Sequence, residues 1–464
     1  MRRNFPICSS VLTNIAMWPA RVMAAAAVAV SWMLLTVAAH ATAEASLQAE
    51  YESAYQAVYE DPENYTHAWR FVIAAKKLGT FDAYETAIGV LEPILLVDED
   101  QQLIRSEVGL LYFRLGAYAA AKAHLQEALD SGKLSAEREA VVKTALSRAR
   151  RETQQNRFRG AVTAGIRYQS NPSFVSDSDT ITFQDTQLQV AGLPQPEGDA
   201  NFFLSSWFRH QYDLDLQNEA TIDTKASLYF TQQFDLTEND ILSFAAEPGF
   251  SFKPLRRQAP WLWLRPHIYG NVLTVGDDLY ALTYGGGIDV IGELTDRIRT
   301  EVTYQRRQRD FRATADRPFA ELLDGAENHY QIKTVILLPK RFSLNLRGLG
   351  IQSMTERAFK DNWLWAVAGQ LNYRYAPPVG WGDSQWRAWL RVVGEFRGFD
   401  APNPSLSATE ERNDQRVTVA VGNSANIYRS LDLNFEYLVQ NQESDFTQFE
   451  FINHSGLVSL TYRY

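Results

Sequence analysis

The sequence predicts an α + β protein of two domains, a small helical domain followed by a transmembrane antiparallel β-barrel of about 14 strands. Three observations lead to this prediction. Apolar residues change from a helical period to a period of two at Arg159. Short alternating segments then continue to the last residue, with turn residues between them. Beyond Ala43 no apolar run is long enough for a spanning helix, so a membrane form of this chain requires a barrel.

Residues 1–43 are predicted to be a secretory signal peptide. A start with arginines and no acidic residue leads into an apolar run from Val22 to Ala39. Either Ala39-His40-Ala41 or Ala41-Thr42-Ala43 then provides a cleavage site with small residues. A single transmembrane anchor is the alternative, because a run of about 18 residues is the minimum for a span.

Charge and composition exclude several classes of function. The formal charge is −10, which argues against nucleic acid as a partner. The only cysteine, Cys8, lies in the segment expected to be removed. The seven histidines and the carboxylates are scattered, no pair has metal-ligand spacing, and His454-Ser455 resembles a hydrolase site only at chance level. We therefore predict no enzyme activity, no cofactor and no metal.

Residues 46–155 are predicted to form a helical domain of the tetratricopeptide repeat (TPR) type. In Glu107–Leu129, small residues at helical spacing would let two antiparallel helices approach, and larger residues would fill the gap between them. Ala68–Leu91 is a degenerate second unit, and Ser135–Arg151 is a closing helix. A generic helical hairpin bundle is the alternative. The candidate groove residues are Tyr112, Tyr118 and Leu125.

Residues 158–464 are predicted to form the barrel. The expected strands are 160–169, 201–214, 220–235, 239–253, 261–275, 279–293, 296–309, 326–338, 341–354, 361–376, 384–399, 412–427, 429–443 and 449–463. The even-numbered connections are all short, whereas the odd-numbered ones include the longest, such as Ser170–Ala200, Asp310–Gly325 and Asp400–Glu411. Outer-membrane barrels have short periplasmic turns and longer outer loops, so both ends of this barrel are expected in the periplasm.

Alternation within the strands predicts an apolar outer face with aromatic residues at its edges. Trp363, Trp365 and Tyr375 lie on one face, opposite Gln370 and Asn372. A soluble β-sandwich also alternates and is the alternative. Leu460, Tyr462 and Tyr464 share the apolar face of the last strand, which resembles the C-terminal signal that the barrel assembly machinery recognises.

The opposite faces carry many charges and predict a hydrated lumen. The candidate lumen residues are Arg299, Glu301, Arg347, Arg374, Arg391, Glu395 and Glu436. A salt-bridge lattice that stiffens the wall is favoured over a substrate-conducting stripe. Gly285, Gly286 and Gly287 are expected to mark a bend or a close approach inside a strand.

The chain resembles the surface lipoprotein assembly modifiers (Slam). The local likeness lies in Gly165-Ile166-Arg167-Tyr168-Gln169-Ser170-Asn171 and in His210-Gln211-Tyr212-Asp213-Leu214, within the order of signal, TPR domain and barrel. The resemblance implies an outer-membrane translocator whose periplasmic helical domain captures a protein client, either a surface lipoprotein or a soluble effector. The expected partners are outer-membrane lipid, the assembly machinery and that client.

Two rival functions stay open at this point. An exopolysaccharide exporter can also combine TPR repeats with a barrel. A passive porin or a structural outer-membrane protein is the second rival, although the helical domain has no obvious use there.

Overall fold

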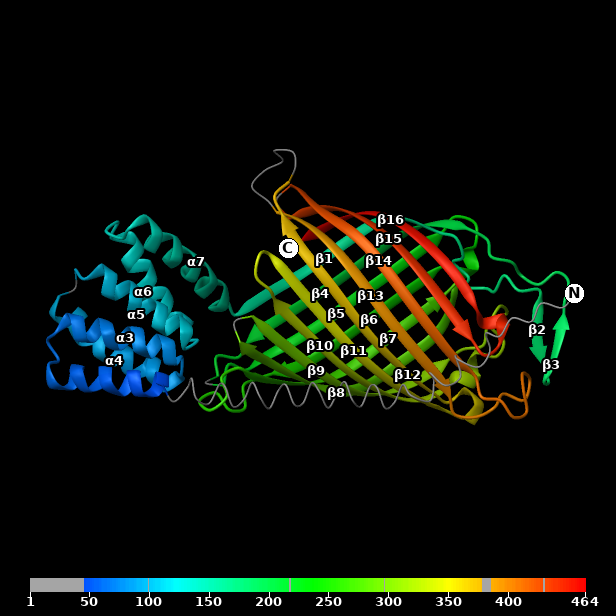
Figure 1. Cartoon of the computed structure of the whole chain (residues 1–464), viewed down its shortest axis with the longest axis horizontal. Coiled ribbons are helices and arrows are strands. Elements are labelled where there is room, and N and C mark those ends of the chain that lie inside the picture. Colours follow the sequence, from blue (N-terminus) through cyan, green and yellow to red (C-terminus); the bar gives the residue numbers. More distant parts are fainter. Residues whose placement is uncertain (1–45, 99, 217, 296, 378–384, 429) are drawn as a thin grey trace, which may run out of the picture. The chain divides into compact units, whose positions relative to one another are not determined.

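The computed structural model describes residues 46–98, 100–216, 218–295, 297–377, 385–428 and 430–464. The predicted signal peptide, with Cys8, lies outside these residues. Contacts divide the chain into two units, with the boundary between Thr153 and Gln154 (Figure 1). The first unit is helical and the second is a closed antiparallel barrel, so the predicted fold class is confirmed.

The first unit is built from helices of about three to five turns. Residues 46–60 are helical, and the later helices are α3 (Tyr65–Leu78), α4 (Phe81–Val97), α5 (Gln102–Arg114), α6 (Tyr118–Asp130) and α7 (Ala136–Glu152). Local signals explain where they begin and end. The Asn64 side chain accepts from the backbone N–H groups of Thr66 and His67 in the first turn of α3, and Gly79 ends α3 in a left-handed conformation with φ of 73°. Among the described helices, none is long and apolar enough to be a membrane span.

Two apolar cores hold these helices together. The larger one contains Phe71 and Leu91, both of which are almost completely buried. The smaller one joins α6 to α7 through Leu125 and Val142. A Cβ atom added to Gly109 would lie 2.8 Å from the Leu125 side chain, so only glycine lets α5 and α6 approach this closely.

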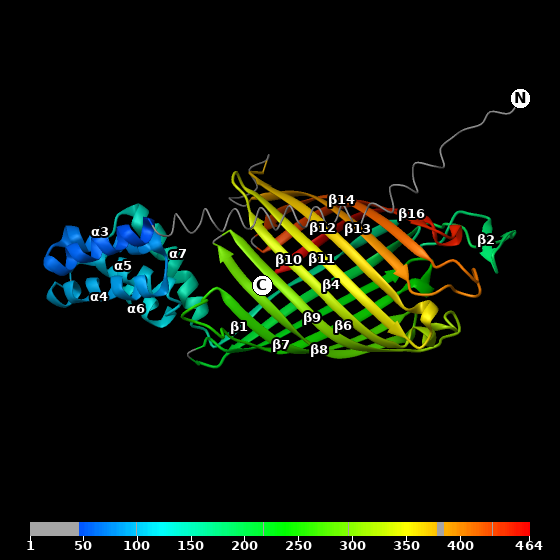
Figure 2. The same cartoon turned by 60° about the horizontal axis from the view of Figure 1, so that its bottom comes forward.

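The second unit is a closed barrel of fourteen antiparallel strands, as predicted (Figure 2). The strands are β1 (Asn156–Gln169), β4 (Asp199–Asp213), β5 (Thr221–Gln233), β6 (Ile241–Ser251), β7 (Leu262–Val275), β8 (Asp278–Thr295), β9 (Ile298–Phe311), β10 (Gly325–Leu337), β11 (Phe342–Thr355), β12 (Asn362–Tyr375), β13 (Trp386–Phe399), β14 (Asn413–Tyr428), β15 (Leu431–Ser444) and β16 (Phe451–Arg463). Each strand begins and ends within four residues of its predicted bounds.

The barrel closes because β16 pairs with β1. Thr163 lies opposite Thr461 in this pair, and Gly160 and Tyr464 exchange two backbone hydrogen bonds of 3.3 and 3.2 Å. We call the end at which β1 begins and β16 finishes the β1 end, and the opposite end the loop end. The long connections 170–198, 312–324 and 400–412 all lie at the loop end, which confirms the predicted asymmetry.

The loop end carries structure that the strand pattern did not predict. A hairpin of β2 (Thr180–Phe183) and β3 (Thr186–Gln189) lies within the first long connection. The backbone N–H of Asp185 donates to Leu406, 2.8 Å away in another loop. Short 3-10 helices occupy four other connections: η1 (Thr237–Asn239), η2 (Ala320–Leu323), η3 (Ala358–Lys360) and η4 (Thr447–Phe449).

Side chains alternate between two faces along every strand of the barrel. On β12 the outward residues Trp365 and Val367 are 52% and 71% exposed, whereas the inward residues Ala366 and Asn372 are buried. Residues directly opposite in register share a face, so the pairing of all fourteen strands assigns each residue to the outside or to the lumen. The outer face is apolar and the lumen is polar.

The glycine run of β8 marks a close approach to the neighbouring strand. A Cβ atom on Gly287 would lie 2.3 Å from the Tyr304 carbonyl oxygen of β9, whereas one on Gly270 would meet nothing within 4 Å. Gly287→Val is therefore expected to cost about 1–3 kcal/mol through forced overpacking, and Gly270→Val much less. The fraction of heat-modifiable, folded barrel on a gel measures both variants. Equal folding of the two would contradict the close approach.

Candidate functional site

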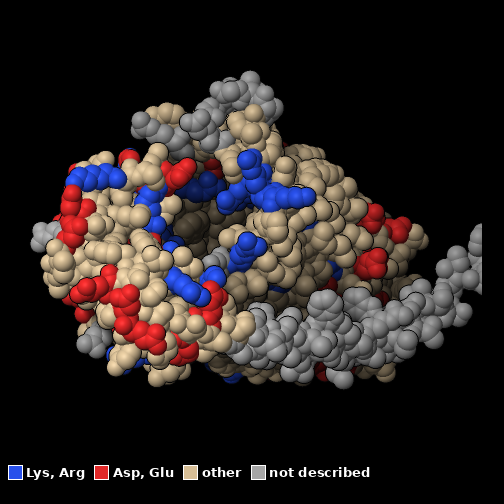
Figure 3. All heavy atoms as spheres, turned by 60° about the vertical axis from the view of Figure 1, so that its left-hand side comes forward, with Lys and Arg blue, Asp and Glu red and all other residues tan. Residues whose placement is uncertain are grey.

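The lumen is the candidate site, because the charged residues of the barrel converge there. Register places all seven of the predicted lumen residues on inward faces: Arg299, Glu301, Arg347, Arg374, Arg391, Glu395 and Glu436. The space-filling view shows several Lys and Arg side chains gathered on one part of the surface (Figure 3).

Arg265 on β7, which is 0% exposed, is the largest fully buried side chain among the described residues. Its Nη1 lies 2.9 Å from the Asp289 carboxylate of β8, and its Nε lies 3.8 Å from the Asp223 carboxylate of β5. Its Nη2 also donates to the backbone carbonyls of Asp223 and Glu247, at 3.1 and 2.5 Å. Arg265 therefore connects β7 with β5, β6 and β8 through ion pairs and hydrogen bonds.

Other ion pairs extend this network along the inner wall from β4 to β10. Arg209 binds Asp223 through two hydrogen bonds. Lys225 lies 3.0 Å from Asp289 and 3.7 Å from Glu301. Further contacts of the network are Lys333–Glu301 at 3.5 Å, Arg307–Glu327 at 3.4 Å and Arg309–Glu327 at 3.2 Å. We call this set the paired wall, because each of its cations lies beside a carboxylate.

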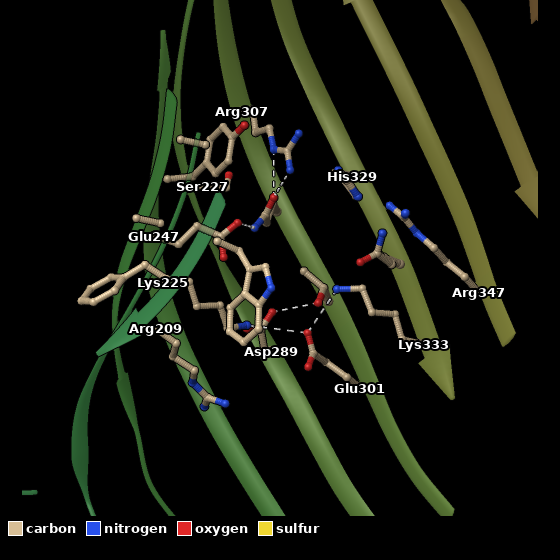
Figure 4. Close-up of a pocket in the computed structure, with 18 residues that line it drawn as sticks. Arg209, Lys225, Ser227, Glu247, Asp289, Glu301, Arg307, His329, Lys333 and Arg347 are labelled. Carbon is tan, nitrogen blue, oxygen red and sulfur yellow. Dashed lines mark hydrogen bonds and ion pairs between the residues drawn. The ribbon is translucent and has the colours of Figure 1, made fainter. Parts of the chain in front are cut away.

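A cavity of about 530 Å³ opens beside the paired wall (Figure 4). Trp207 lines it and is 51% exposed although it faces inward. The Arg307 guanidinium lies 4.2 Å from the centre of the Tyr269 ring, and Arg347 contributes a further cation. This volume is in the range of small-molecule sites. The cavity therefore offers aromatic and charged groups to a small polar solute.

The predicted lumen residues outside the paired wall divide into two groups. Arg391 lies 3.4 Å from Glu436, and Glu395 lies 3.4 Å from Arg416, as the lattice hypothesis requires. Arg347 and Arg374, by contrast, have no ion pair among the described residues. Arg299 and Arg391 lie on one line of directly opposite residues that runs across the strands. Three uncharged residues, one on each of β10, β11 and β12, separate them on this line, so the four predicted arginines form no continuous stripe.

The sequence-based candidates missed the centre of the network, which is Asp223, Arg265 and Asp289. Arg265 and Asp289 have no residue of fixed charge next to them on the inward faces of their strands, and Asp223 has only Lys225, so none of the three stood out in a run of charges. The sequence did contain one signal for these residues, because the alternation along each strand places all three at inward positions.

The predicted groove of the helical unit is only partly accessible. Leu125 is 0% exposed and packs in the core between α5, α6 and α7, so it cannot contact a client. Tyr118 packs edge-on against Phe113, with ring centres 5.6 Å apart. The Tyr112 hydroxyl donates to Glu92 at 2.6 Å, and burial together with this carboxylate raises the pKa of Tyr112 to about 12.

Glu107 of α5 is the most deeply buried charge among the described residues of the helical unit, with its side chain 2% exposed. Its carboxylate accepts from Lys76 of α3 at 2.6 Å and also from Arg138 of α7. Burial raises the pKa of Glu107, but the hydrogen bonds and the charges of Lys76 and Arg138 outweigh burial and hold this pKa below the ordinary value of 4.5. Glu107 therefore connects three helices of the unit.

The C-terminal residues proposed as an assembly signal lie on the outer face. Leu460, Tyr462 and Tyr464 are 45%, 54% and 51% exposed. The Tyr462 and Tyr464 rings stack with their centres 6.4 Å apart. All three side chains are therefore accessible on the outer face at the end of β16.

Comparison with known proteins gives only distant likenesses. No family model matches the chain, and no curated protein matches it. Among solved structures, the outer membrane channel DcaP of Acinetobacter baumannii is 11% identical, with a TM-score of 0.37, and covers 67% of this chain and 97% of its own. A Pseudomonas aeruginosa FadL homologue is 11% identical, with a TM-score of 0.34, over 67% and 90%. Pseudomonas aeruginosa OpdK with vanillate is 10% identical, with a TM-score of 0.32, over 66% and 99%. We draw no functional conclusion from similarity at this level.

Proposed function

We propose that this protein is an outer-membrane channel that lets small polar solutes pass through its lumen, with the β1 end and the helical unit in the periplasm. The outer surface of the barrel supports this proposal. Ile268, Val367 and Tyr437 are 65%, 71% and 51% exposed on outward faces. An apolar belt around a closed barrel is stable when lipid covers it, whereas water would drive it to aggregate.

The interior supports passage of solutes rather than a dry core. Lumen side chains are charged or polar on every strand from β4 to β10, and the cavity of about 530 Å³ lies among them. Charged side chains of this number stay hydrated or paired, so the lumen would hold water. This cavity is the observation on which the channel proposal mainly rests.

Conductance across a planar lipid bilayer tests the channel. The purified full chain should insert with discrete current steps in KCl, and it should sediment with outer membranes after sucrose-gradient fractionation. A preparation heated to unfold the barrel is the control and should give no steps. Outer-membrane localisation without any current would overturn the channel proposal, and a soluble folded protein would overturn the membrane location as well.

Export of a protein client, as the Slam resemblance implies, is a second candidate function. The observation that favours it is the close α5–α6 hairpin at Gly109, because such hairpins form protein-binding repeats. Surface proteomics of a deletion strain, read beside an antibiotic-uptake assay, separates the candidates. Loss of one specific surface protein with unchanged uptake would favour export. Lower uptake of small polar drugs with an unchanged surface proteome would favour the channel, and lost exopolysaccharide would favour the polysaccharide rival.

A further inference from the structure

Cross-strand register in the lumen usually places opposite charges face to face. Seven such pairs occur on inward faces: Lys225–Glu247, Arg265–Asp289, Arg299–Glu293, Lys333–Glu301, Arg307–Glu327, Glu395–Arg416 and Arg397–Asp414. Directly opposite side chains begin about 5 Å apart, so these pairings stabilise the sheet. The general rule of this lumen is therefore local charge balance.

One pair of strands places two arginines face to face, and among the described residues neither of them forms an ion pair. Arg374 of β12 lies directly opposite Arg387 of β13, near the β1 end. Three other basic pairs occur, Arg159–Arg209, Arg209–Lys225 and Lys333–Arg347. In each of them at least one member has a carboxylate partner, since Arg209 binds Asp223, Lys225 lies 3.0 Å from Asp289 and Lys333 lies 3.5 Å from Glu301. Like charges directly opposite destabilise a sheet. Among the described basic pairs of the lumen, Arg374–Arg387 is the one in which neither member has an ion pair to offset this cost.

Within the part of the chain that the structure describes, the side chains of Arg347, Arg374 and Arg387 also have no hydrogen-bond partner. Among the described residues none of the three forms an ion pair or a side-chain hydrogen bond. The Nε atom of Arg387 is buried and unsatisfied. Arg347 lines the cavity from β11, next to Lys333 of the paired wall (Figure 4). We call these three residues the arginine wall.

We propose that the arginine wall makes the channel selective for anions and binds solutes that carry a carboxylate or phosphate group. This inference rests on the proposed channel function and names its substrate class. A guanidinium presents several N–H donors in a planar fork that matches carboxylate and phosphate oxygens. A bound anion would satisfy the open donors and remove the repulsion between Arg374 and Arg387.

The contrast between the two walls explains why the positive charge of the arginine wall acts on solutes in the lumen. On the paired wall each cation already has a carboxylate beside it, so its field is largely cancelled within the protein. The field of the arginine wall is not cancelled in this way, and the low-dielectric barrel wall directs it into the lumen. Anions would therefore concentrate there and cations would be repelled.

Reversal potentials in a KCl gradient test the selectivity. The unchanged channel should prefer chloride over potassium. In the triple variant Arg347→Gln, Arg374→Gln, Arg387→Gln, the ratio of anion to cation permeability is expected to fall by on the order of tenfold, the scale on which a charged cleft concentrates counter-ions. The charge-neutral variant Arg391→Gln, Glu436→Gln is the matched control, because it removes a lumen pair at 3.4 Å, and it should keep the selectivity.

Inorganic phosphate tests binding separately. Phosphate added at fixed ionic strength should reduce chloride current through the unchanged channel, and this block should weaken in the triple variant but not in the control. A cation-selective channel, or a triple variant with unchanged selectivity and block, would overturn the arginine-wall proposal while leaving the channel itself intact. A correctly folded chain that conducts no current would instead overturn the channel function. Gel mobility of heated and unheated samples verifies that each variant is folded.

Discussion

Replacing Arg265 by methionine is expected to destabilise the barrel by about 3 kcal/mol, the low end of the range for removing one partner of a buried ion pair. The guanidinium is 0% exposed and lies 2.9 Å from Asp289, so its loss leaves the Asp223 and Asp289 carboxylates undercompensated in a buried place. The low end applies because Asp223 keeps Arg209 and Asp289 keeps Lys225. Two backbone carbonyls also lose their donor.

Equilibrium unfolding of the barrel in lipid vesicles measures this change. Guanidinium titration followed by tryptophan fluorescence gives the free energy of unfolding for each variant. Arg299→Met is the matched control, since Arg299 also faces the lumen and lies 3.7 Å from Glu293, but both side chains are about half exposed. An exposed pair contributes at most about 1 kcal/mol. An equal loss of unfolding free energy in the two variants would show that the buried network stabilises the barrel no more than an exposed ion pair does.

Replacing Glu107 by alanine is expected to destabilise the helical unit by about 3 kcal/mol or more. The substitution leaves Lys76 and Arg138 without their shared carboxylate and opens a small cavity between α3, α5 and α7. Glu50→Ala is the control, because the Glu50–Lys77 pair spans 2.6 Å at the exposed surface and should contribute at most about 1 kcal/mol. Urea unfolding of the full chain, followed by circular dichroism at the helix band, compares the two.

Acid should weaken the helical unit through the same residue. The pKa of Glu107 is lower in the folded unit than in the unfolded chain, so the unfolded chain binds more protons in the interval between the two values. The stabilisation is fully present above about pH 4.5 and is lost as the pH falls through the folded pKa. The Glu107→Ala variant should show a shallower fall over this interval. A parallel fall in both proteins would assign the acid sensitivity to other carboxylates.

The strand count and the bounds of the strands could be predicted because each depends on a local pattern. Successive side chains of a strand point to opposite faces whatever the neighbouring strands are. The period of two therefore identified the strands and the inward positions of Arg299, Arg347 and Arg374. The β2–β3 hairpin was missed because its residues are mostly exposed and polar. Contacts from other loops hold it, including the Asp185–Leu406 hydrogen bond.

Tertiary structure alone determined which groups meet within each domain. Leu125 fitted the repeat pattern but is buried, because the approach of α5 at Gly109 and the packing of α7 close over it. The meeting of Asp223, Arg265 and Asp289 depends on the register of β5, β7 and β8, which is set by closure of the whole barrel. A one-residue shift would move each of these charges to the outer face of the barrel.

Two kinds of information therefore specify this protein. Its sequence by itself determined an N-terminal helical domain, fourteen strands and the charged inward faces of those strands, since these follow from periods of a few residues. The division of the lumen into a paired wall and an arginine wall came only with the fold. Whether a charge has a partner depends on distances between strands that are far apart in the chain, and no local pattern contains those distances.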